Sequence, residues 1–499
     1  MRQTLHIFRK DVRYLRHEIA LVVLIALVFA ALHARASNSD DLWWAELALV
    51  VAAAFLIGRL ILAETIPGDR QFWITRPYRW RSLLGAKLLF IVVFVNLPVL
   101  LAHVFILIVD RFPIVSNLPG LLWSQWMLFA FVALPFAALA TLSSSMAAFI
   151  FAQLIVLAIG FGVWEIFVPN ATAQLGSVVW VRYSAALLVL AAAVISVIVI
   201  QYKSRRTFFS RACAMGGLLI AALAFLAMPW PLALAVQSRL SRQLPLGTSL
   251  QITLGHQSGE RSWLAQMKPK VALHLPILVQ GIPDGTEIEP DAIRISLQSD
   301  NGRSTATTLS DCADLKRESI SAKSAAIMTK CLVDPAFFEQ EHQRPVTLRV
   351  SLYLTLFGNA RSQTIPLTDE PSNAPDGLQC YTDSVRAEWD VYCRSAFRWP
   401  SRLVYAKLGH TNANSFTQSV SYSPFPANLV IDPVETRWAS AYAAGPTPVV
   451  HDVTIIVEEP LAHVQRDFEM HGVHLDELAY PTVRYLSGPP IASSADILR

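Results

Sequence analysis

The chain has 499 residues, of which 54% are apolar and 16% are charged, and its formal net charge is +4. Soluble domains carry roughly 25% charged residues, so this composition is typical of a membrane protein. So small a net charge does not indicate a nucleic-acid partner, and none is expected. The long apolar runs lie in residues 1–236, whereas residues 237–499 have the composition of an ordinary folded domain.

Seven apolar segments are predicted to span a membrane. A helix needs about 20 mostly apolar residues to cross a hydrocarbon core about 30 Å thick. The predicted spans are 18–35, 43–63, 86–109, 120–142, 146–168, 183–201 and 212–236, and residues 1–17 before them form a basic amphipathic segment. The first span is short, and only "LSSS" separates the fourth from the fifth. A chain with five or six spans is therefore the alternative.

Lys and Arg gather in alternate connectors between these spans. They are Arg2, Arg9, Lys10, Arg13 and Arg16 before the first span, Arg70, Arg76, Arg79, Arg81 and Lys87 after the second, and Lys203, Arg205, Arg206 and Arg211 after the sixth. The opposite connectors carry one basic residue each: Arg35, Arg111 and Arg182. Cytoplasmic loops are enriched in Lys and Arg. The pattern predicts an inner-membrane protein with a cytoplasmic N-terminus and an extracytoplasmic domain at 237–499.

Four of the five cysteines lie in the predicted outer domain, and Cys213 lies at the edge of a span. An even number of cysteines in an extracytoplasmic domain is typical of disulfides in an oxidising compartment. We predict the sequence-local pairs Cys312–Cys331 and Cys380–Cys393. Zinc is the alternative, but no two of these cysteines have C-x₂-C spacing, and no metal site is expected.

The connector "ETIPGDRQFWITRPYRWRSLLGAK", residues 64–87, is basic and aromatic. Pro67 and Gly68 are expected to end the helix of the second span. "RQFWITR" can then form a short amphipathic helix, which Pro77 stops. Arg and Trp at a cytoplasmic membrane edge also serve as ordinary anchors in multispan proteins, and this is the alternative interpretation of the segment.

Residues 1 to about 210 resemble the permease subunits of ABC-2 type transporters. The resemblance rests on "HIFRKDVRYLRHE" before the first span and on the connector. In that family an acidic residue ends the second span, followed by a glycine, an aromatic or leucine-rich stretch, a proline with basic residues, and a lysine that opens the third span. The corresponding positions here are Glu64, Gly68, Phe72, Trp73, Ile74, Arg76, Pro77, Arg79 and Lys87, and Arg70 lies within the same candidate segment.

The resemblance implies that this segment touches a separately encoded cytoplasmic ATPase and that two permease subunits assemble. The chain has no G-x-x-x-x-G-K-[ST] sequence of its own, so the partner would hydrolyse ATP. No enzymatic activity and no cofactor are expected of this chain. Within the spans, Asn96 and Gln153 are candidates for lining a substrate pathway. Hydrogen bonding between helices is the alternative role for both residues.

The outer domain is predicted to be an antiparallel β-sandwich, or two small ones. Strands are expected at 270–280, 292–299, 345–357, 402–409 and 448–459, and a short helix within 460–479. His463, His471 and His474 invite a metal hypothesis, but their spacing matches no zinc motif. Permeases of the ABC-2 type usually lack a large domain after a seventh span, so the role of this domain is open.

The sequence favours the permease subunit of an ATP-driven ABC-2 type exporter in a bacterial inner membrane. The alternative is a membrane-anchored sensor or assembly factor. In that case the outer β-domain would bind a ligand or an envelope partner, and the spans would serve as an anchor and relay.

Overall fold

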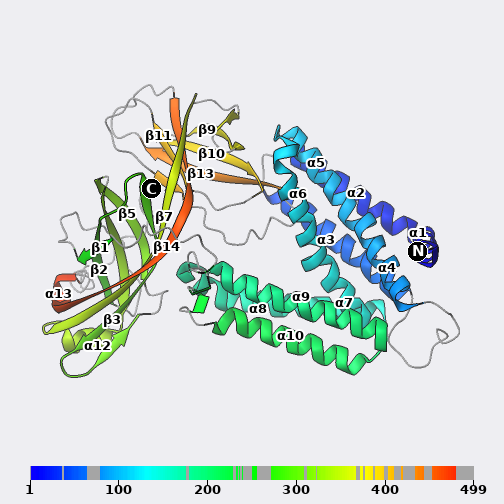
Figure 1. The fold of residues 1–499 in the computed structure, drawn as a ribbon, viewed down its shortest axis with the longest axis horizontal. Coiled ribbons are helices and arrows are strands. Elements are labelled where there is room, and N and C mark those ends of the chain that lie inside the picture. Colours follow the sequence, from blue (N-terminus) through cyan, green and yellow to red (C-terminus); the bar gives the residue numbers. More distant parts are fainter. Residues whose placement is uncertain are drawn as a thin grey trace, which may run out of the picture. The chain divides into compact units, whose positions relative to one another are not determined.

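The computed structural model describes residues 2–35, 39–63, 79–175, 179–228, 232–233, 235–236, 239, 250–254, 271–307, 312–321, 323–366, 371–374, 377–385, 388–397, 403–408, 417–419, 433–442 and 452–478. The chain divides into two compact units, each built from separate segments. The first unit comprises Met1–Glu165, Val178–Gln237 and Ala360–Glu459, and the second comprises Ile166–Ser177, Ser238–Asn359 and Pro460–Arg499. Figure 1 shows the helices and the strands.

The N-terminal half is helical (Figure 1). Its helices are α1 (Arg2–Tyr14), α2 (Arg16–Arg35), α3 (Ser39–Leu62), α4 (Trp80–Ile91), α5 (Leu97–Val109), α6 (Ile114–Leu128), α7 (Leu134–Leu142), α8 (Met146–Leu175), α9 (Val179–Ser204) and α10 (Thr207–Ala227). Within the described residues, six helical segments are long and apolar enough to cross a membrane. They are Arg16–His33, Trp44–Leu62, Trp80–Val109, Ile114–Leu142, Val181–Ser204 and Thr207–Leu226. The chain is therefore a membrane protein by helix length and composition.

Six of the seven predicted spans match these segments and differ from them mainly at the ends. The predicted span at 146–168 lies within α8, of which Met146–Gly160 is a shorter apolar segment. The third and fourth spans begin at Trp80 and Ile114, six residues before the predicted starts, and the last ends at Leu226 rather than 236. Hydropathy marks the part of a helix that lies in hydrocarbon, whereas the first helical turns can be polar.

Two π-helical turns keep the third and fourth spans continuous. The turn η2 (Val92–Asn96) joins α4 to α5, and η3 (Phe129–Ala133) joins α6 to α7. Each turn directly precedes a helix with proline in its first turn, Pro98 or Pro135. Proline lacks the N–H that would bond four residues back, and its ring crowds that carbonyl. The wider turn accommodates the ring without breaking the helix, which matters where no water can satisfy the backbone.

The C-terminal half is β-rich. Its strands are β1 (Gln251–Leu254), β2 (Val271–Gln280), β3 (Thr286–Ser299), β4 (Ser304–Ala306), β5 (Cys312–Ser321), β6 (Ser324–Val333), β7 (Pro345–Pro366), β8 (Ser372–Asn373), β9 (Gln379–Val385), β10 (Glu388–Ala396), β11 (Leu403–Leu408), β12 (Thr417–Ser419), β13 (Val434–Tyr442) and β14 (Asp452–His474). Among the described residues, the short helices α12 (Pro335–Glu341) and α13 (Leu475–Leu478) accompany them. The long strands β7 and β14 each contribute residues to both units.

These strands form three sheets with antiparallel pairs. The strand orders are β1-β2-β6-β5, β13-β10-β9-β8 and β12-β11-β14-β7-β3-β4. Every second residue of β7 from Val346 to Leu356 is buried in one hydrophobic cluster, as the alternation of apolar and polar residues predicts. The same cluster includes every second residue of β2 from Leu273 to Val279. One core is therefore shared by the four-stranded sheet β1-β2-β6-β5 and the six-stranded sheet.

The predicted strands are confirmed, with β3, β7 and β14 longer than expected. The helix predicted within 460–479 is wrong over most of its length, because β14 continues to His474 and only Leu475–Leu478 are helical. Ala462, Val464, Phe468 and Met470 contribute to the hydrophobic cluster at even positions, which is the period of a strand.

Candidate functional site

Most of the candidate coupling segment lies outside the described residues. This applies to Glu64, Gly68, Arg70, Phe72, Trp73, Ile74, Arg76 and Pro77. Arg79 and Lys87 are described. Arg79 has an exposed side chain and extended backbone, and its carbonyl accepts hydrogen bonds from the N–H groups of Ser82 and Leu83. It therefore occupies the residue before α4, where the connector becomes the third span.

Lys87 forms a buried ion pair with the N-terminal helix. Its ammonium Nζ lies 2.9 Å from Oδ2 of Asp11 on α1, and the two side chains are 2% and 4% exposed. Because its side chain is buried against α1, Lys87 cannot itself contact a partner protein. Sequence reasoning missed Asp11, although a signal was present. Asp11 lies four residues from Ile7 and from Leu15, both buried, and so belongs to the packed face of the helix.

Three aromatic rings pack between the same elements. Phe8 of α1 stacks on Phe94 with centroids 5.8 Å apart, and it meets the edge of Phe90 at 6.2 Å. Phe90 and Phe94 are themselves 4.8 Å apart. Aromatic pairs at such separations add to the free energy of packing. The ion pair and the rings together hold α1 against α4 and η2.

The end of the second span is attached to the same N-terminal region. Nε of Arg59, in the last turn of α3, lies 3.3 Å from Oε1 of Glu18 on α2. The Arg59 guanidinium also lies 5.7 Å from the ring centroid of Tyr14 on α1. The connector follows α3 and is followed by α4. Both of its ends are therefore fixed to the N-terminal region.

Asn96, a candidate pathway residue, forms hydrogen bonds between the third and fourth spans. Its Nδ2 donates to the backbone oxygen of Gln125 at 2.9 Å and to Oε1 of the same residue at 3.3 Å. Gln153 lies on α8, and its Nε2 has no hydrogen-bond partner within the described part of the chain. The geometry around Asn96 is that of a bond between helices. A role of either residue in a pathway stays a prediction.

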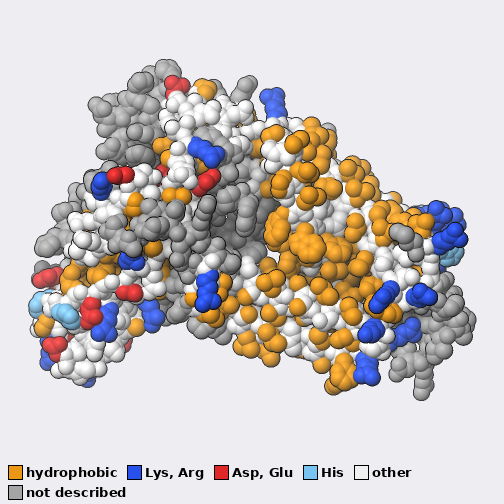
Figure 2. Space-filling model, in the orientation of Figure 1, with side chains coloured by type: hydrophobic (Ala, Val, Ile, Leu, Met, Phe, Trp, Pro, Cys, Tyr) orange, Lys and Arg blue, Asp and Glu red, His pale blue; other side chains and the backbone are white. Residues whose placement is uncertain are grey.

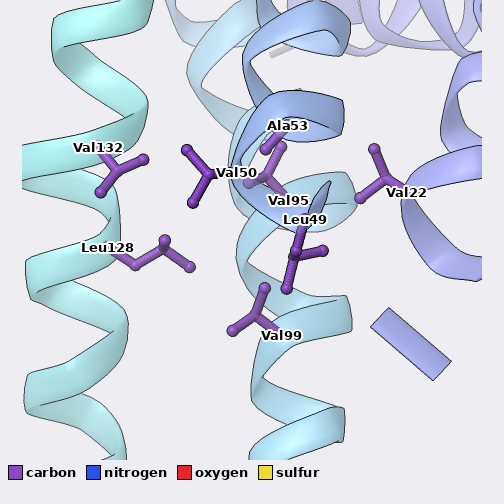
Figure 3. A pocket seen from close by; sticks show the side chains of 8 residues that line it. All are labelled: Val22, Leu49, Val50, Ala53, Val95, Val99, Leu128 and Val132. Carbon is purple, nitrogen blue, oxygen red and sulfur yellow. The ribbon is translucent and has the colours of Figure 1, made fainter. Parts of the chain in front are cut away.

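A small cavity lies between the first four spans. Its volume is about 10 Å³. It is lined by Val22, Leu49, Val50, Ala53, Val95, Val99, Leu128 and Val132, as Figure 3 shows. A cavity of this size holds one water molecule at most, and an apolar lining gives that water no hydrogen bonds. The cavity is a packing defect between spans, and neither Asn96 nor Gln153 lines it.

At the end of the third span, a residue of the β-rich region contacts the helices. Nη2 of Arg394, on β10, donates to Oδ2 of Asp110 at 2.7 Å, and Asp110 directly follows α5. Nδ1 of His33, near the end of α2, lies 3.7 Å from the same oxygen. These three residues all belong to the first unit. A strand far along the chain thus reaches the helix ends opposite to those that flank the 64–78 connector.

An apolar contact accompanies this ion pair. Gly120 of α6 packs so closely on Phe397 that a Cβ atom added there would lie 2.7 Å from the phenyl ring. The Phe397 ring also meets the edge of the His103 ring, with centroids 6.5 Å apart. Val434 of β13 is buried in the same hydrophobic cluster as the spans. Residues of β10, of β13 and of the chain just after β10 therefore share a core with α5 and α6.

Both disulfides are present with the predicted pairing. Cys312 of β5 is bonded to Cys331 of β6, and Cys380 of β9 is bonded to Cys393 of β10. In each case the two cysteines are directly opposite each other in an antiparallel pair. The second disulfide lies beside Arg394 and so fixes the strand pair that reaches the helices. Cys213 is the free cysteine, as expected.

Two histidines of β14, His463 and His471, lie in hydrogen bonds with β7. Oγ1 of Thr355 donates to Oδ2 of Asp291 at 2.6 Å and lies 2.7 Å from Nδ1 of His463, so the imidazole N–H can donate to it. His471 lies 3.0 Å from Oγ1 of Thr347. Among the described residues, no group of three or more His, Cys, Asp or Glu side chains is placed to hold a metal ion. The geometry assigns these histidines to contacts between strands.

We expect stability of the β-rich region to fall in acid because of His463. Burial lowers the pKa of this imidazole from 6.5 to about 4. His463 is therefore protonated below about pH 6.5 in the unfolded chain but only below about pH 4 in the folded chain. Stability is full above pH 6.5 and falls as the pH drops towards 4, by at most about 3 kcal/mol.

The measurement is thermal unfolding of the full chain between pH 7 and pH 4, beside His463→Gln. The amide keeps a donor for Thr355 but does not titrate in this range. The unfolding free energy of the wild-type chain, relative to that of the variant, should fall as the pH drops from 6.5 towards 4. A difference that does not change with pH would contradict the assignment.

Comparison of the sequence with known protein families, with curated proteins and with solved structures finds no match.

Proposed function

We propose that the chain is the membrane permease subunit of an ATP-driven ABC-2 type exporter, working with a separately encoded cytoplasmic ATPase and a second permease subunit. The observation that carries the proposal is the anchoring of the connector. The last turn of α3 contacts the N-terminal region through Arg59, and the beginning of α4 contacts it through Lys87. A partner that moves residues 64–78 would therefore act on a segment whose two ends are held by the N-terminal region. The movement would pass into the second and third spans.

The proposed topology has seven spans, a cytoplasmic N-terminus and an extracytoplasmic β-sandwich domain in a bacterial inner membrane. It is supported by the charges at the two ends of the helices. Exposed Arg9, Arg13, Arg79 and Arg81 lie near the ends that flank the connector. At the other end, Asp110 meets Arg394 of the β-rich region. Positive charge on the cytoplasmic side and a disulfide-bonded region on the other side agree with each other.

Purification of the membrane complex tests the proposal. A cytoplasmic ATPase should be recovered with the wild-type chain, and the complex should hydrolyse ATP. The variant with Arg76→Gln, Pro77→Ala and Arg79→Gln should lose it, because it removes the charges and the helix stop of the proposed contact. Arg294→Gln with Arg303→Gln, which alters exposed residues of the β-rich region, is the control and should retain the ATPase. Recovery of no ATPase with the wild-type chain would overturn the proposal.

A sensor or assembly factor is the second candidate, and the contact of Arg394 and Phe397 with the spans favours it. Through this contact, a ligand bound to the β-rich region could shift the ends of the third and fourth spans directly. This function would be preferred if the wild-type chain purified without an ATPase but retained a ligand or an envelope protein on its β-rich region.

A further inference from the structure

We propose that one face of the N-terminal helix is a binding surface for the headgroups of anionic phospholipids. Arg2, Arg9, Arg13 and Arg16 are exposed, and their spacing of seven, four and three residues places them along one stripe. We call these four residues the basic stripe. The hydrogen bonds from Leu15 N–H to Asp11 and from Ile19 N–H to Leu15 continue the helical pattern from α1 into α2. The stripe therefore extends over four turns of nearly continuous helix.

The ion pair with Lys87 leaves the charge of this stripe uncompensated. Asp11 is the one acidic residue in the sequence of α1, and it is buried against Lys87 on the opposite face. Within the described part of the chain, no carboxylate forms an ion pair with Arg2, Arg9 or Arg13. Docking of α1 by Lys87 and Phe8 also fixes which face of the helix points away from the protein. The result is a fixed row of guanidinium groups available to an anion.

The apolar side chains next to the stripe favour lipid over an acidic soluble protein. Leu5, Phe8 and Val12 are spaced by three and four residues and lie between the stripe and the buried face. Leu5 is 45% exposed, and Phe8 and Val12 are partly buried. A helix in the headgroup layer places such an apolar flank towards the acyl chains and its arginines towards phosphate. An acidic soluble protein would leave the exposed part of this flank, chiefly Leu5, in water.

The surrounding surface has the same character. Lys and Arg side chains gather at the end of the helical part where the chain begins, as Figure 2 shows. Exposed Lys203, Arg205 and Arg206 lie between α9 and α10, and the side chains that follow, Phe208 and Phe209, are 79% and 56% exposed. The guanidinium of Arg206 lies 5.6 Å from the Phe209 ring centroid. Exposed aromatic rings beside basic residues are typical of a membrane–water interface.

The test uses the full chain purified in a non-ionic detergent and stripped of lipid. It is titrated with phosphatidylglycerol or with phosphatidylcholine, and bound lipid is counted by native mass spectrometry. The wild-type chain should bind phosphatidylglycerol more tightly, and this preference should weaken as ionic strength rises. Arg9→Gln with Arg13→Gln should lower the affinity for phosphatidylglycerol about 30-fold, or about fivefold for each charge, and leave phosphatidylcholine binding unchanged.

The matched control is Arg294→Gln with Arg303→Gln, which removes two exposed charges from the β-rich region. It should leave the binding of both lipids unchanged. Equal affinity of the wild-type chain for both lipids would overturn the proposal, and so would unchanged phosphatidylglycerol binding by the α1 variant. If the α1 variant instead loses a co-purifying protein while its lipid binding is unchanged, the stripe binds protein and the lipid proposal fails. The lipid titration contains no ATPase, so its outcome is separate from that of the proposed function.

Discussion

Replacing Lys87 by methionine should destabilise the helical part by about 3–5 kcal/mol. Methionine fills most of the volume of the lysine stem, so the change removes the ammonium group and little packing. The Asp11 carboxylate then stays buried without the ammonium that lies 2.9 Å from it in the wild-type chain. Desolvation of a carboxylate that has lost its cation accounts for the cost. Chemical unfolding of the purified chain in detergent measures the change in unfolding free energy.

A second substitution separates the charge from the packing of the same residues. Asp11→Leu combined with Lys87→Met should recover most of the lost stability, because an apolar pair can replace a buried ion pair at little cost. Arg9→Gln, on the exposed face of the same helix, is the matched control and should change the unfolding free energy by less than about 0.5 kcal/mol. A Lys87→Met protein as stable as the wild type would show that the pair does not hold α1.

The ion pair also changes the interpretation of the coupling segment. The resemblance placed Lys87 in the segment as the lysine that opens the third span, and the charge pattern counted it among the basic residues of the connector. The structure places it in the core, where it can act on a partner only through α1. If force reaches the connector from an ATPase, the Lys87→Met variant should weaken its transmission to the third span. Arg79 differs, because its side chain is exposed and free to take part in the contact itself.

The sequence was a good guide where one physical signal dominated. Six spans follow from apolar runs alone, and both disulfides follow from pairing cysteines that are close in the chain. The extension of the third span to Trp80 was missed because the first turns of that helix are polar. The π-turns were missed because Pro98 and Pro135 indicate a kink or a hinge equally well, and only the backbone shows that the helices continue.

The errors in the β-rich region have a different cause. Between Leu461 and His474 most odd positions are polar, but Arg466 and Gly472 interrupt the apolar residues at the even positions and obscure the alternation. Ala462, Val464, Phe468 and Met470 show the period of two once β7 is beside them. The contact of Arg394 with Asp110 joins residues 284 positions apart, and no local pattern predicts it. Contacts of this kind depend on tertiary packing.

Breaking the disulfide between Cys312 and Cys331 should destabilise the β-rich region by about 2–5 kcal/mol. The bond closes a loop between residues 19 positions apart, and both cysteines are buried in the shared core of the sheets. Cys312→Ala with Cys331→Ala removes the constraint on the unfolded chain without leaving a thiol. Thermal unfolding of the full chain, with and without reductant, measures the change.

The redox compartment gives this prediction a second readout that bears on topology. The wild-type chain should lose stability when reductant is added, whereas the Cys312→Ala, Cys331→Ala variant should lose only the part that Cys380–Cys393 contributes. Alkylation of intact cells before lysis should find these four thiols blocked as disulfides if the region lies in an oxidising compartment. Cys213 is the internal control, since its thiol is free. Four reactive thiols in intact cells would place the β-rich region in the cytoplasm and would reverse the orientation that the arginines of the connectors predict.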